Sequence, residues 1–144
     1  MIRFIIHGEP VAKGRPKFSN RGGYVKAYTP QKTLNYENLI KVSYDTQVED
    51  KTKLEGEIFA EILAFFPIPK STSKKKSLQM DSGEIMHTKK SDCDNIAKIV
   101  LDALNNIAYD DDRQVCSLTV KKFYSTYPRV EVSLWERKEI FLEV

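Results

Sequence analysis

The sequence predicts an α+β fold, in which a mixed β-sheet packs against two main helices within a single domain spanning residues 1–144. A length of 144 residues suits one domain, and 41% hydrophobic residues are enough to form a core. Strand-like apolar runs occur near both ends and in the middle of the chain, whereas residues 31–48 and 94–105 repeat apolar side chains at helical spacing. No internal repeat or shift in composition indicates a second domain.

The N-terminal region predicts a strand followed by a basic turn. Residues 2–7 are apolar enough for a strand, which the following glycine and proline end. Residues 11–18 alternate bases with glycine and proline, and a residue that precedes proline is held extended. The bases that this extended backbone places on one side are Lys13, Arg15 and Lys17. Residues 20–23 are expected to turn, and residues 24–28 to return as a short strand.

The middle of the chain predicts a helix, a core strand and a short basic segment. The helix covers about residues 31–48, with Thr29 or Thr33 as its cap and a proline allowed in its first turn. Residues 58–68 form the strongest predicted strand, because they are too continuously apolar to be exposed on both faces. A basic segment then runs to about Met80, and its candidate starting residues are Ser71 and Ser73. Residues 81–90 have the least pattern of regular structure.

The C-terminal third predicts a strongly amphipathic helix over about residues 94–105. Its buried stripe comprises Ile96, Ile99, Val100, Ala103, Leu104 and Ile107, and its opposite side carries Asp94, Lys98 and Asn105. Asp94 is a suitable cap, and Asn106 tolerates the left-handed conformation that ends a helix. Residues 114–123 and 129–137 then alternate like an antiparallel pair of strands joined by residues 125–128.

The charge is unevenly distributed along the chain. The net charge is +3, but residues 92–112 hold six aspartates and one lysine, which leaves 22 Lys and Arg against 14 Asp and Glu elsewhere. A basic remainder favours a polyanionic partner, although an unevenly charged solvated surface explains the same counts. No apolar run approaches the length of a membrane span or a signal peptide, so a cytoplasmic location without membrane contact is expected. Cys93 and Cys116 lack metal-ligand spacing and are expected to be free thiols.

Three aspartates predict a divalent-metal site around the amphipathic helix. Asp92 and Asp94 lie at its start and Asp112 follows its end, where a returning chain brings them together. Clustered carboxylates need cations, and Mg²⁺ prefers such hard oxygen ligands while retaining water. A metal-bound water can attack a phosphodiester, and Lys98, one turn away, can stabilise the developing charge. Taken singly, however, each aspartate is explained by a helix cap or a turn, and Lys98 by a surface ion pair.

The motifs resemble the RusA family of Holliday junction resolvases. The family pattern Asp-x-Asp-Asn-x-x-Lys, Asp-Ala-Leu-Asn-Gly and Asp-Asp-x-Gln-Val is similar to residues 92–98, 102–106 and 111–115 here. Residues 8–17 resemble a subset of the family, as do residues 28–30. The sequence differs from the pattern at Ser91, where proline is common, and at Asn106, which replaces glycine. Asp110 is an extra acid, which leaves open which member of the 110–112 triplet contacts metal.

The resemblance implies a homodimeric, Mg²⁺-dependent endonuclease, with Mn²⁺ as a possible substitute, which acts on branched DNA in recombination and repair and is often found in prophages. It makes Asp92, Asp94 and Asp112 the catalytic, metal-binding acids, Asp111 the candidate fourth carboxylate, and Lys98 a base-type residue required for cleavage. Paired incisions at a four-way junction are expected to leave 5′-phosphate and 3′-hydroxyl ends. Two other classes remain open: a non-catalytic DNA-binding module, and a metal-dependent phosphohydrolase acting on nucleotides, although the chain has no phosphate-binding glycine loop.

Basic residues outside the acidic motifs are the candidates for DNA contacts. They are Lys13, Arg15, Lys17, Arg21, Lys74, Lys75, Lys76, Lys89 and Lys90. Tyr24 and Tyr28 are suited either to stacking on an unpaired base or, more simply, to core packing of their hairpin. Leu101 is the one apolar residue on the polar side of the amphipathic helix, and it suits either packing under a loop or a dimer contact.

Overall fold

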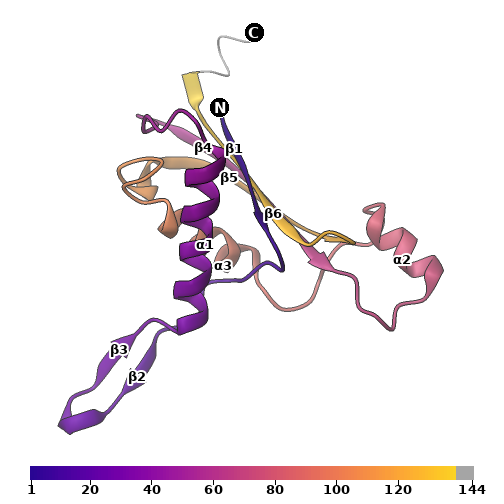
Figure 1. Cartoon of the computed structure of the whole chain (residues 1–144), viewed down its shortest axis with the longest axis horizontal. Helices are drawn as coiled ribbons and strands as arrows, with labels where there is room; N and C mark the ends of the chain where they lie inside the picture. The colour runs from indigo at the N-terminus through magenta and orange to yellow at the C-terminus, as the bar shows by residue number, and fades with distance from the viewer. Residues whose placement is uncertain (139–144) are drawn as a thin grey trace.

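A four-stranded mixed sheet forms the centre of the molecule in the computed structural model, which describes residues 1–138 apart from the Arg21 side chain (Figure 1). Its strands are β1 (Ile2–His7), β4 (Ile58–Pro67), β5 (Val115–Ser125) and β6 (Arg129–Glu136), in the order β1-β6-β4-β5. β6 is antiparallel to both β1 and β4, whereas β4 and β5 run parallel. The predicted mixed sheet is therefore confirmed.

Two helices cover one face of this sheet, and a third lies at its end (Figure 1). The covering helices are α1 (Gln31–Gln47) and α3 (Cys93–Ala103), which contact each other, and α2 (Lys74–Asp81) projects to one side. Alternate residues of β4 are buried, and they form one core cluster with Ile40 of α1 and Ile99 of α3. The predicted arrangement of two main helices against a mixed sheet is correct.

The pairing predicted for the last two strands is wrong. β5 and β6 are consecutive in sequence, but β4 lies between them and pairs with both. The physical reason is the composition of β4, whose ten residues alternate between buried and partly buried. A strand that is apolar on both sides gains most from a position inside the sheet, where neighbours cover both of its edges.

Both main helices are capped by residues other than those predicted. Pro30 is the N-cap of α1 and makes no side-chain cap bond, so neither Thr29 nor Thr33 caps it. Thr33 is instead buried, and its hydroxyl accepts the backbone N–H of Gly14 at 3.1 Å. Asp92, rather than Asp94, is the N-cap residue of α3, again without a cap bond. Asp94 lies in the first turn, where its negative charge interacts favourably with the positive end of the helix dipole.

Other predicted chain signals are confirmed. Ser73 is the N-cap of α2, and its hydroxyl accepts the backbone N–H of Lys76. Asn106 has a φ of 63°, which is the left-handed conformation expected after α3. Leu101 is buried and its carbonyl oxygen accepts the Tyr109 hydroxyl at 2.6 Å, so it packs inside its own chain.

The second sheet is a small hairpin that projects away from the rest of the molecule (Figure 1). It pairs β2 (Lys17–Ser19) with β3 (Lys26–Tyr28), and the single turn η1 (Arg21–Gly23) connects them. The turn is where the sequence predicts it, and the returning strand is shorter than predicted. Tyr24 and Tyr28 are exposed, so the expectation that they pack in a core is wrong. Among the helices of residues 1–138, none has the length and apolar character needed to cross a bilayer.

Candidate functional site

Helix α3 presents a polar stripe along its exposed side. Asp94, Lys98 and Asp102 follow one another at four-residue spacing, so their side chains lie along one face of the helix. The opposite face anchors the helix, since Ile96, Ile99 and Val100 are almost completely buried. The burial of that face fixes the rotation of α3, and thereby the direction in which the stripe points.

The loop after α3 brings Asp112 to the C-terminal end of this stripe. The backbone N–H of Asp112 donates to the side-chain oxygen of Asn105 at 2.8 Å. Asp111 caps the short η2 turn (Asp112–Gln114), and its carboxylate accepts the backbone N–H of Arg113 at 2.9 Å. Gln114 completes a capping box by accepting the backbone N–H of Asp111 at 3.0 Å. Asn105 and Gln114 therefore hold the two acids in place through backbone bonds.

The carboxyl group of Asp112 lies in an environment that disfavours its charge. Burial raises its pKa above the ordinary value, and contacts with the carboxyl groups of Asp102 and Asp111 raise it further. Asp111 responds oppositely, because the backbone N–H of Arg113 stabilises its charged form and lowers its pKa. Tyr109, buried beside these acids, has a raised pKa because of burial and of the nearby negative charges. The acids thus accumulate negative charge at one end of α3.

Lys13 is the base that the structure places against this acidic group. Its ammonium nitrogen lies 3.3 Å from a carboxylate oxygen of Asp102 and 3.4 Å from one of Glu37 on α1. Its backbone N–H donates to the carbonyl oxygen of Asn95 in the first turn of α3, at 2.9 Å. Lys13, predicted as a DNA contact, is therefore occupied by an ion pair that joins the N-terminal segment to α1 and α3.

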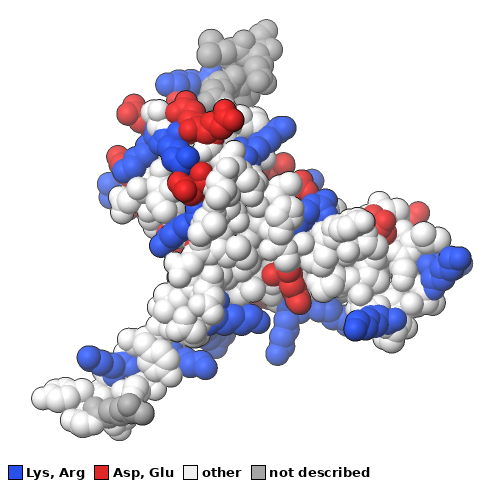
Figure 2. All heavy atoms as spheres, in the orientation of Figure 1, with Lys and Arg blue, Asp and Glu red and all other residues white. Residues whose placement is uncertain are grey.

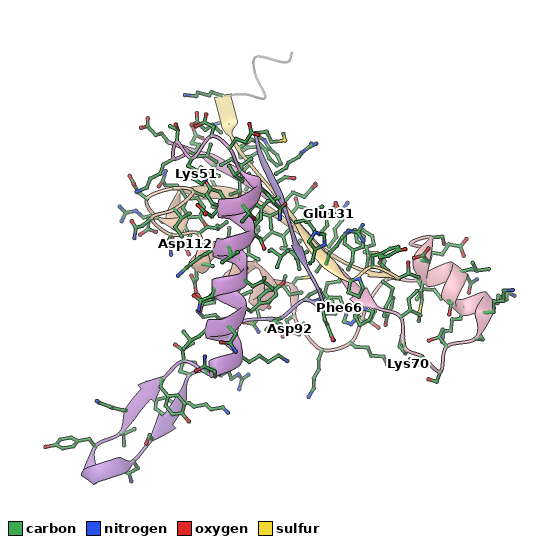
Figure 3. The ribbon with its side chains drawn as sticks, in the orientation of Figure 1. Lys51, Phe66, Lys70, Asp92, Asp112 and Glu131 are labelled. Carbon is green, nitrogen blue, oxygen red and sulfur yellow. The ribbon has the colours of Figure 1, made fainter. Side chains whose placement is uncertain are left out.

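Asp92 and Asp94 lie at the other end of α3 from Asp112 (Figure 3). Eight residues separate Asp94 from Asp102, which corresponds to a rise of about 12 Å along the helix axis. Among residues 1–138, no three His, Cys, Asp or Glu side chains gather closely enough to hold a metal ion. A single chain therefore does not bring Asp92, Asp94 and Asp112 together as the sequence predicts. The reason is that they flank a helix along its length rather than across it.

Lys98 occupies the middle of the stripe, four residues from an acid on either side. Its side chain is exposed, and the described part of the chain contains no ion pair that involves it, so the surface salt bridge with Asp94 expected from sequence is not formed. Its ammonium group is thus available to an anionic ligand that approaches this face of α3.

The carboxylates around Asp112 match the ligand chemistry of Mg²⁺. This ion takes hard oxygen ligands and commonly binds through one or two carboxylates while retaining several waters. The nearby carboxyl groups of Asp102 and Asp111 raise the pKa of Asp112, so a cation bound here would neutralise charge that the fold disfavours. Asp102 and Asp111 are the neighbouring oxygen donors. The carboxylates that suit Mg²⁺ therefore lie at the C-terminal end of α3, and Asp92 and Asp94 are separate oxygen donors at its N-terminal end.

The remaining predicted DNA contacts lie on the two projections and between them. Arg15 and Lys17 lead into the hairpin, whose turn begins at Arg21. The first turn of α2 presents three exposed lysines: Lys74, Lys75 and Lys76. Lys89 and Lys90 precede α3, and with Lys17 and Lys32 they line a cavity of about 750 Å³. Figure 2 shows blue but no red spheres along the hairpin projection.

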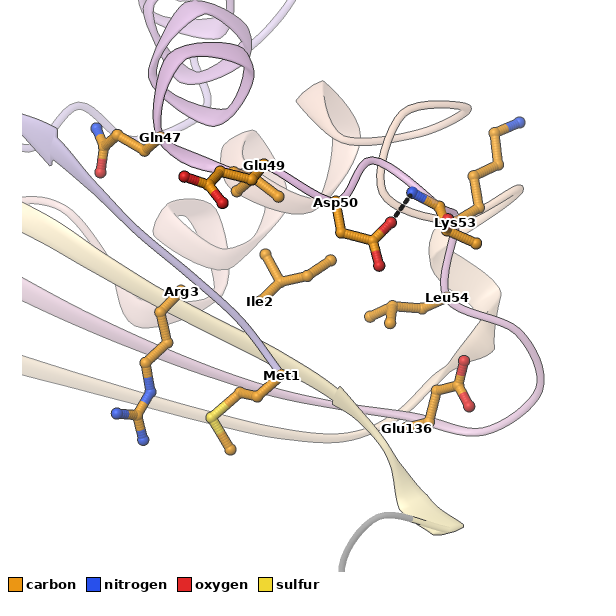
Figure 4. Close-up of a pocket in the computed structure, with 11 residues that line it drawn as sticks. Met1, Ile2, Arg3, Gln47, Glu49, Asp50, Lys53, Leu54 and Glu136 are labelled. Atoms are coloured by element: carbon orange, nitrogen blue, oxygen red, sulfur yellow. Dashed lines mark hydrogen bonds between the residues drawn. The ribbon is translucent and has the colours of Figure 1, made fainter.

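A second cavity, of about 510 Å³, lies at the opposite end of the molecule and contains none of the predicted site residues (Figure 4). Its lining includes Glu49, Asp50 and Glu136. Asp50 is engaged in a turn, where its carboxylate accepts the backbone N–H of Thr52 at 3.0 Å and its pKa is lowered as a result. Nothing in this cavity brings together groups suited to hydrolysis.

Asp102 is the acid of this site that sequence reasoning did not assign. Its position four residues after Lys98 was the available signal, because this spacing continues the stripe that begins at Asp94. Its contact with Asp112 depends on the path of residues 104–111, which sequence periodicity does not predict. Asn105 was assigned to the polar side of the helix, but its role in holding Asp112 likewise becomes visible only in the folded chain.

Comparison with known proteins supports the resemblance of the motifs. The family model of endodeoxyribonuclease RusA matches residues 7–135, which include both projections, all of α3 and the acidic loop. The chain is also 41% identical over 137 residues to "Uncharacterized protein YqaN" of Bacillus subtilis (strain 168), and the match covers 94% of this chain and 96% of that protein. The family is one of metal-dependent nucleases that act on Holliday junctions. On the strength of a match that spans nearly the whole described fold, this chain belongs to the RusA endodeoxyribonuclease family.

Proposed function

We propose that this protein is a Mg²⁺-dependent, structure-selective endonuclease that resolves Holliday junctions by paired incisions. The observation that carries the proposal is the acidic group at the C-terminal end of α3, where burial and the carboxyl groups of Asp102 and Asp111 raise the pKa of Asp112. It lies one helical turn from Lys98, which makes no ion pair within residues 1–138, on an otherwise basic protein of the RusA family. Carboxylates that concentrate charge next to a free ammonium group fit the hydrolysis of a phosphodiester better than they fit DNA binding alone.

The roles of the residues follow from their chemistry. Asp112 and Asp111 are proposed metal ligands at one end of the stripe, and Asp92 and Asp94 at the other. When bound at these residues, Mg²⁺ would supply an activated water and would stabilise the leaving oxygen. Lys98 orients the scissile phosphate and offsets its developing negative charge. Incision of this kind leaves a 5′-phosphate and a 3′-hydroxyl.

A homodimer is part of the proposal, because a four-way junction requires two symmetric cuts. A two-fold enzyme presents two equivalent sites to the two strands that must be cut. The separation of Asp92 and Asp94 from Asp112 within one chain adds a second reason. Paired catalytic metal ions lie about 4 Å apart, whereas the two ends of this stripe are about 12 Å apart along the helix. The acids of one chain therefore serve two distinct positions, or meet acids of a second chain.

DNA recognition in this proposal depends on shape and charge. The lysines of the hairpin, of α2 and of the loop before α3 contact phosphates, which position DNA without reading its sequence. The hairpin and α2 project from the body in different directions (Figure 2). Lysines line a cavity formed by the base of the hairpin and the loop before α3, which supports a branched rather than a linear partner. The same basic surface would also suit a DNA-binding module without catalysis. Only a test of DNA cleavage distinguishes that alternative from the nuclease.

The deciding experiment compares a mobile four-way junction with a plain duplex of the same sequence. We expect Mg²⁺ to support paired nicks in the junction and little cutting of the duplex, EDTA to stop the cutting, and Mn²⁺ to restore it. Ligation of the products without prior phosphorylation tests for 5′-phosphate ends. Binding without nicking under any metal would favour the non-catalytic module. Release of phosphate from free nucleotides without DNA cleavage would favour a phosphohydrolase.

A further inference from the structure

The projecting hairpin, residues 17–28, exposes large apolar side chains that have no covering partner in residues 1–138. Phe18 is 70% exposed, Tyr24 77%, Val25 69% and Tyr28 49%. Isolated exposed hydrophobic residues are ordinary, but four on one short projection are unusual. The strand register pairs Lys17 with Tyr28 and Phe18 with Ala27, so Phe18 and Tyr28 lie on opposite faces of the hairpin. None of them packs in the core cluster.

The hairpin is weakly held by its own structure and firmly held at its base. Its two strands form only three residue pairs, and such a two-stranded ribbon has little stability by itself. Just before it, the backbone N–H of Gly14 donates to the buried hydroxyl of Thr33, and that of Lys13 donates to Asn95 in α3. The base is thereby fixed to the helix that carries Asp92 and Asp94. A ligand held by the hairpin is presented to that helix at a defined position.

The charge of the hairpin identifies the kind of partner. Residues 17–28 contain three Lys and Arg and no Asp or Glu: Lys17, Arg21 and Lys26. Tyr24, Tyr28 and Lys26 line a cavity of about 420 Å³ on the hairpin, so aromatic rings and an ammonium group face the same space. Aromatic rings next to cations are the combination that proteins use to bind unpaired nucleotides, by stacking on the base and pairing with its phosphate.

We propose that this hairpin is a stacking arm that inserts at the centre of branched DNA, where Tyr24 and Tyr28 hold an unpaired base. The inference rests on the proposed function and adds the element that distinguishes a branch point from a duplex. A duplex offers no accessible base face, whereas bases next to a branch point unstack at lower cost. The arm thus contributes selectivity for structure, and the lysines on it contribute affinity for any DNA.

The test places the fluorescent base 2-aminopurine at the branch point of a four-way junction, and in a second junction ten base pairs away. Binding is measured in Ca²⁺ without Mg²⁺. We expect the wild-type protein to change the emission at the branch point and not at the distant position. Tyr24→Ala is expected to lose this change and about 10-fold in affinity for the junction relative to duplex, as stacking of one base typically contributes. Tyr24→Phe, which keeps the ring, is expected to retain both.

Tyr127→Ala is the matched control, because Tyr127 is 78% exposed on the turn between β5 and β6, away from the hairpin. Equal behaviour of Tyr24→Ala and Tyr127→Ala, in a protein that cuts junctions, would overturn the stacking arm and leave the proposed function intact. Absence of junction binding and cutting by the wild type would overturn both. A change in sedimentation mass caused by Tyr24→Ala, without loss of the fluorescence signal, would show that the arm contacts a second protein chain instead. Thermal melting verifies that each variant is folded.

Discussion

At the scale of the residue, Asp110 and Asp112 show how the same side chain is given different properties two positions apart. Asp110 is exposed and pairs with Lys53 at 3.1 Å. Asp112 is partly buried against Asp102 and Asp111, which raises its pKa. The sequence contains three consecutive aspartates and does not distinguish them. The fold distinguishes them through the backbone bond from Asp112 to Asn105, which turns the third aspartate toward α3.

Asp112→Asn is expected to remove cleavage and to preserve binding to the junction. The loss should be roughly 100-fold or more, as is typical when one group that stabilises the reacting charge is removed. Asp110→Asn is the matched control and should change the cleavage rate only slightly, because its partner is a surface lysine. Single-turnover cleavage and electrophoretic binding assays measure the two properties. Loss of binding together with cleavage in Asp112→Asn would indicate that the acid supports the fold rather than the reaction.

The raised pKa of Asp112 also predicts an effect on stability. A carboxyl group whose pKa is higher in the folded than in the unfolded state stabilises the fold when protonated, and this contribution is lost as pH rises through the folded pKa. At neutral pH, therefore, the ionised Asp112 is unfavourable. In EDTA at pH 7 we expect Asp112→Asn to melt at a higher temperature than the wild type. The difference in melting temperature should shrink as pH falls below the ordinary aspartate pKa. If Asp112→Asn melts lower than the wild type at pH 7, the carboxylates do not repel one another as proposed.

Lys98→Ala is expected to slow cleavage by roughly 100-fold with little change in junction affinity, because one exposed lysine among many contributes little to binding. Alanine is a good helix former, so α3 should remain intact. Lys41→Ala, on the exposed side of α1, is the control and should cleave like the wild type. If Lys98→Ala lowers junction affinity, and its cleavage rate at saturating protein equals that of the wild type, Lys98 acts in DNA binding rather than in cleavage.

At the scale of the element, the helices and most strands could be predicted from sequence because their apolar residues recur at regular spacing. The stripe of α3 and the apolar run of β4 are the clearest cases. Strand partners could not be predicted, since β5 and β6 satisfy the same alternation whether they pair with each other or with β4. The cap of α1 could not be predicted either, because the Thr33 hydroxyl accepts a hydrogen bond from Gly14, nineteen residues earlier in the chain.

Gly14 is a position where the contact between elements forbids a side chain. A Cβ atom at residue 14 would lie 2.7 Å from the Thr33 hydroxyl and 3.2 Å from the ring of Pro30. We expect Gly14→Ala to destabilise the protein by about 1–3 kcal/mol, the usual cost of overpacking. It should also shift the hairpin and so reduce cleavage of junctions. Chemical denaturation measures the first effect and the junction assay the second.

A double-mutant cycle separates the clash at Gly14 from the lost hydrogen bond. Thr33→Ala removes the hydroxyl and should cost about 1 kcal/mol, because the N–H of Gly14 loses its acceptor. In the double variant Gly14→Ala, Thr33→Ala the closest clash is absent, so the combined cost should be smaller than the sum of the single costs. Strict additivity would indicate that the methyl group is accommodated by movement of the backbone instead.

At the scale of the whole molecule, the distribution of charge could be read from the sequence, and its arrangement in space could not. Six aspartates within residues 92–112 leave a basic remainder, as the counts indicate. The fold then separates these aspartates along α3 and sends the bases out on two projections (Figure 1). Sequence spacing cannot show this separation, because it depends on the helix being a rigid spacer between Asp94 and Asp102. Within residues 1–138 of one chain, the expected convergence of three acids is not seen for this reason.

Mixing of active and inactive subunits tests whether two chains act on one junction. Wild-type protein is mixed with excess Asp112→Asn protein, allowed to exchange, and added to a junction carried in a supercoiled plasmid. If each subunit of a dimer cuts one strand, mixed dimers make a single incision, so nicked circles should accumulate in place of linear resolved product. The ratio of nicked to linear DNA should rise with the fraction of the variant, because few dimers then contain two active subunits. Two observations would contradict a dimer with independent sites: a nicked-to-linear ratio that never changes, or the disappearance of both products in proportion to the mixed dimers. The second result would have its own meaning, since it would show that an inactive site in one chain also prevents cutting by the other chain.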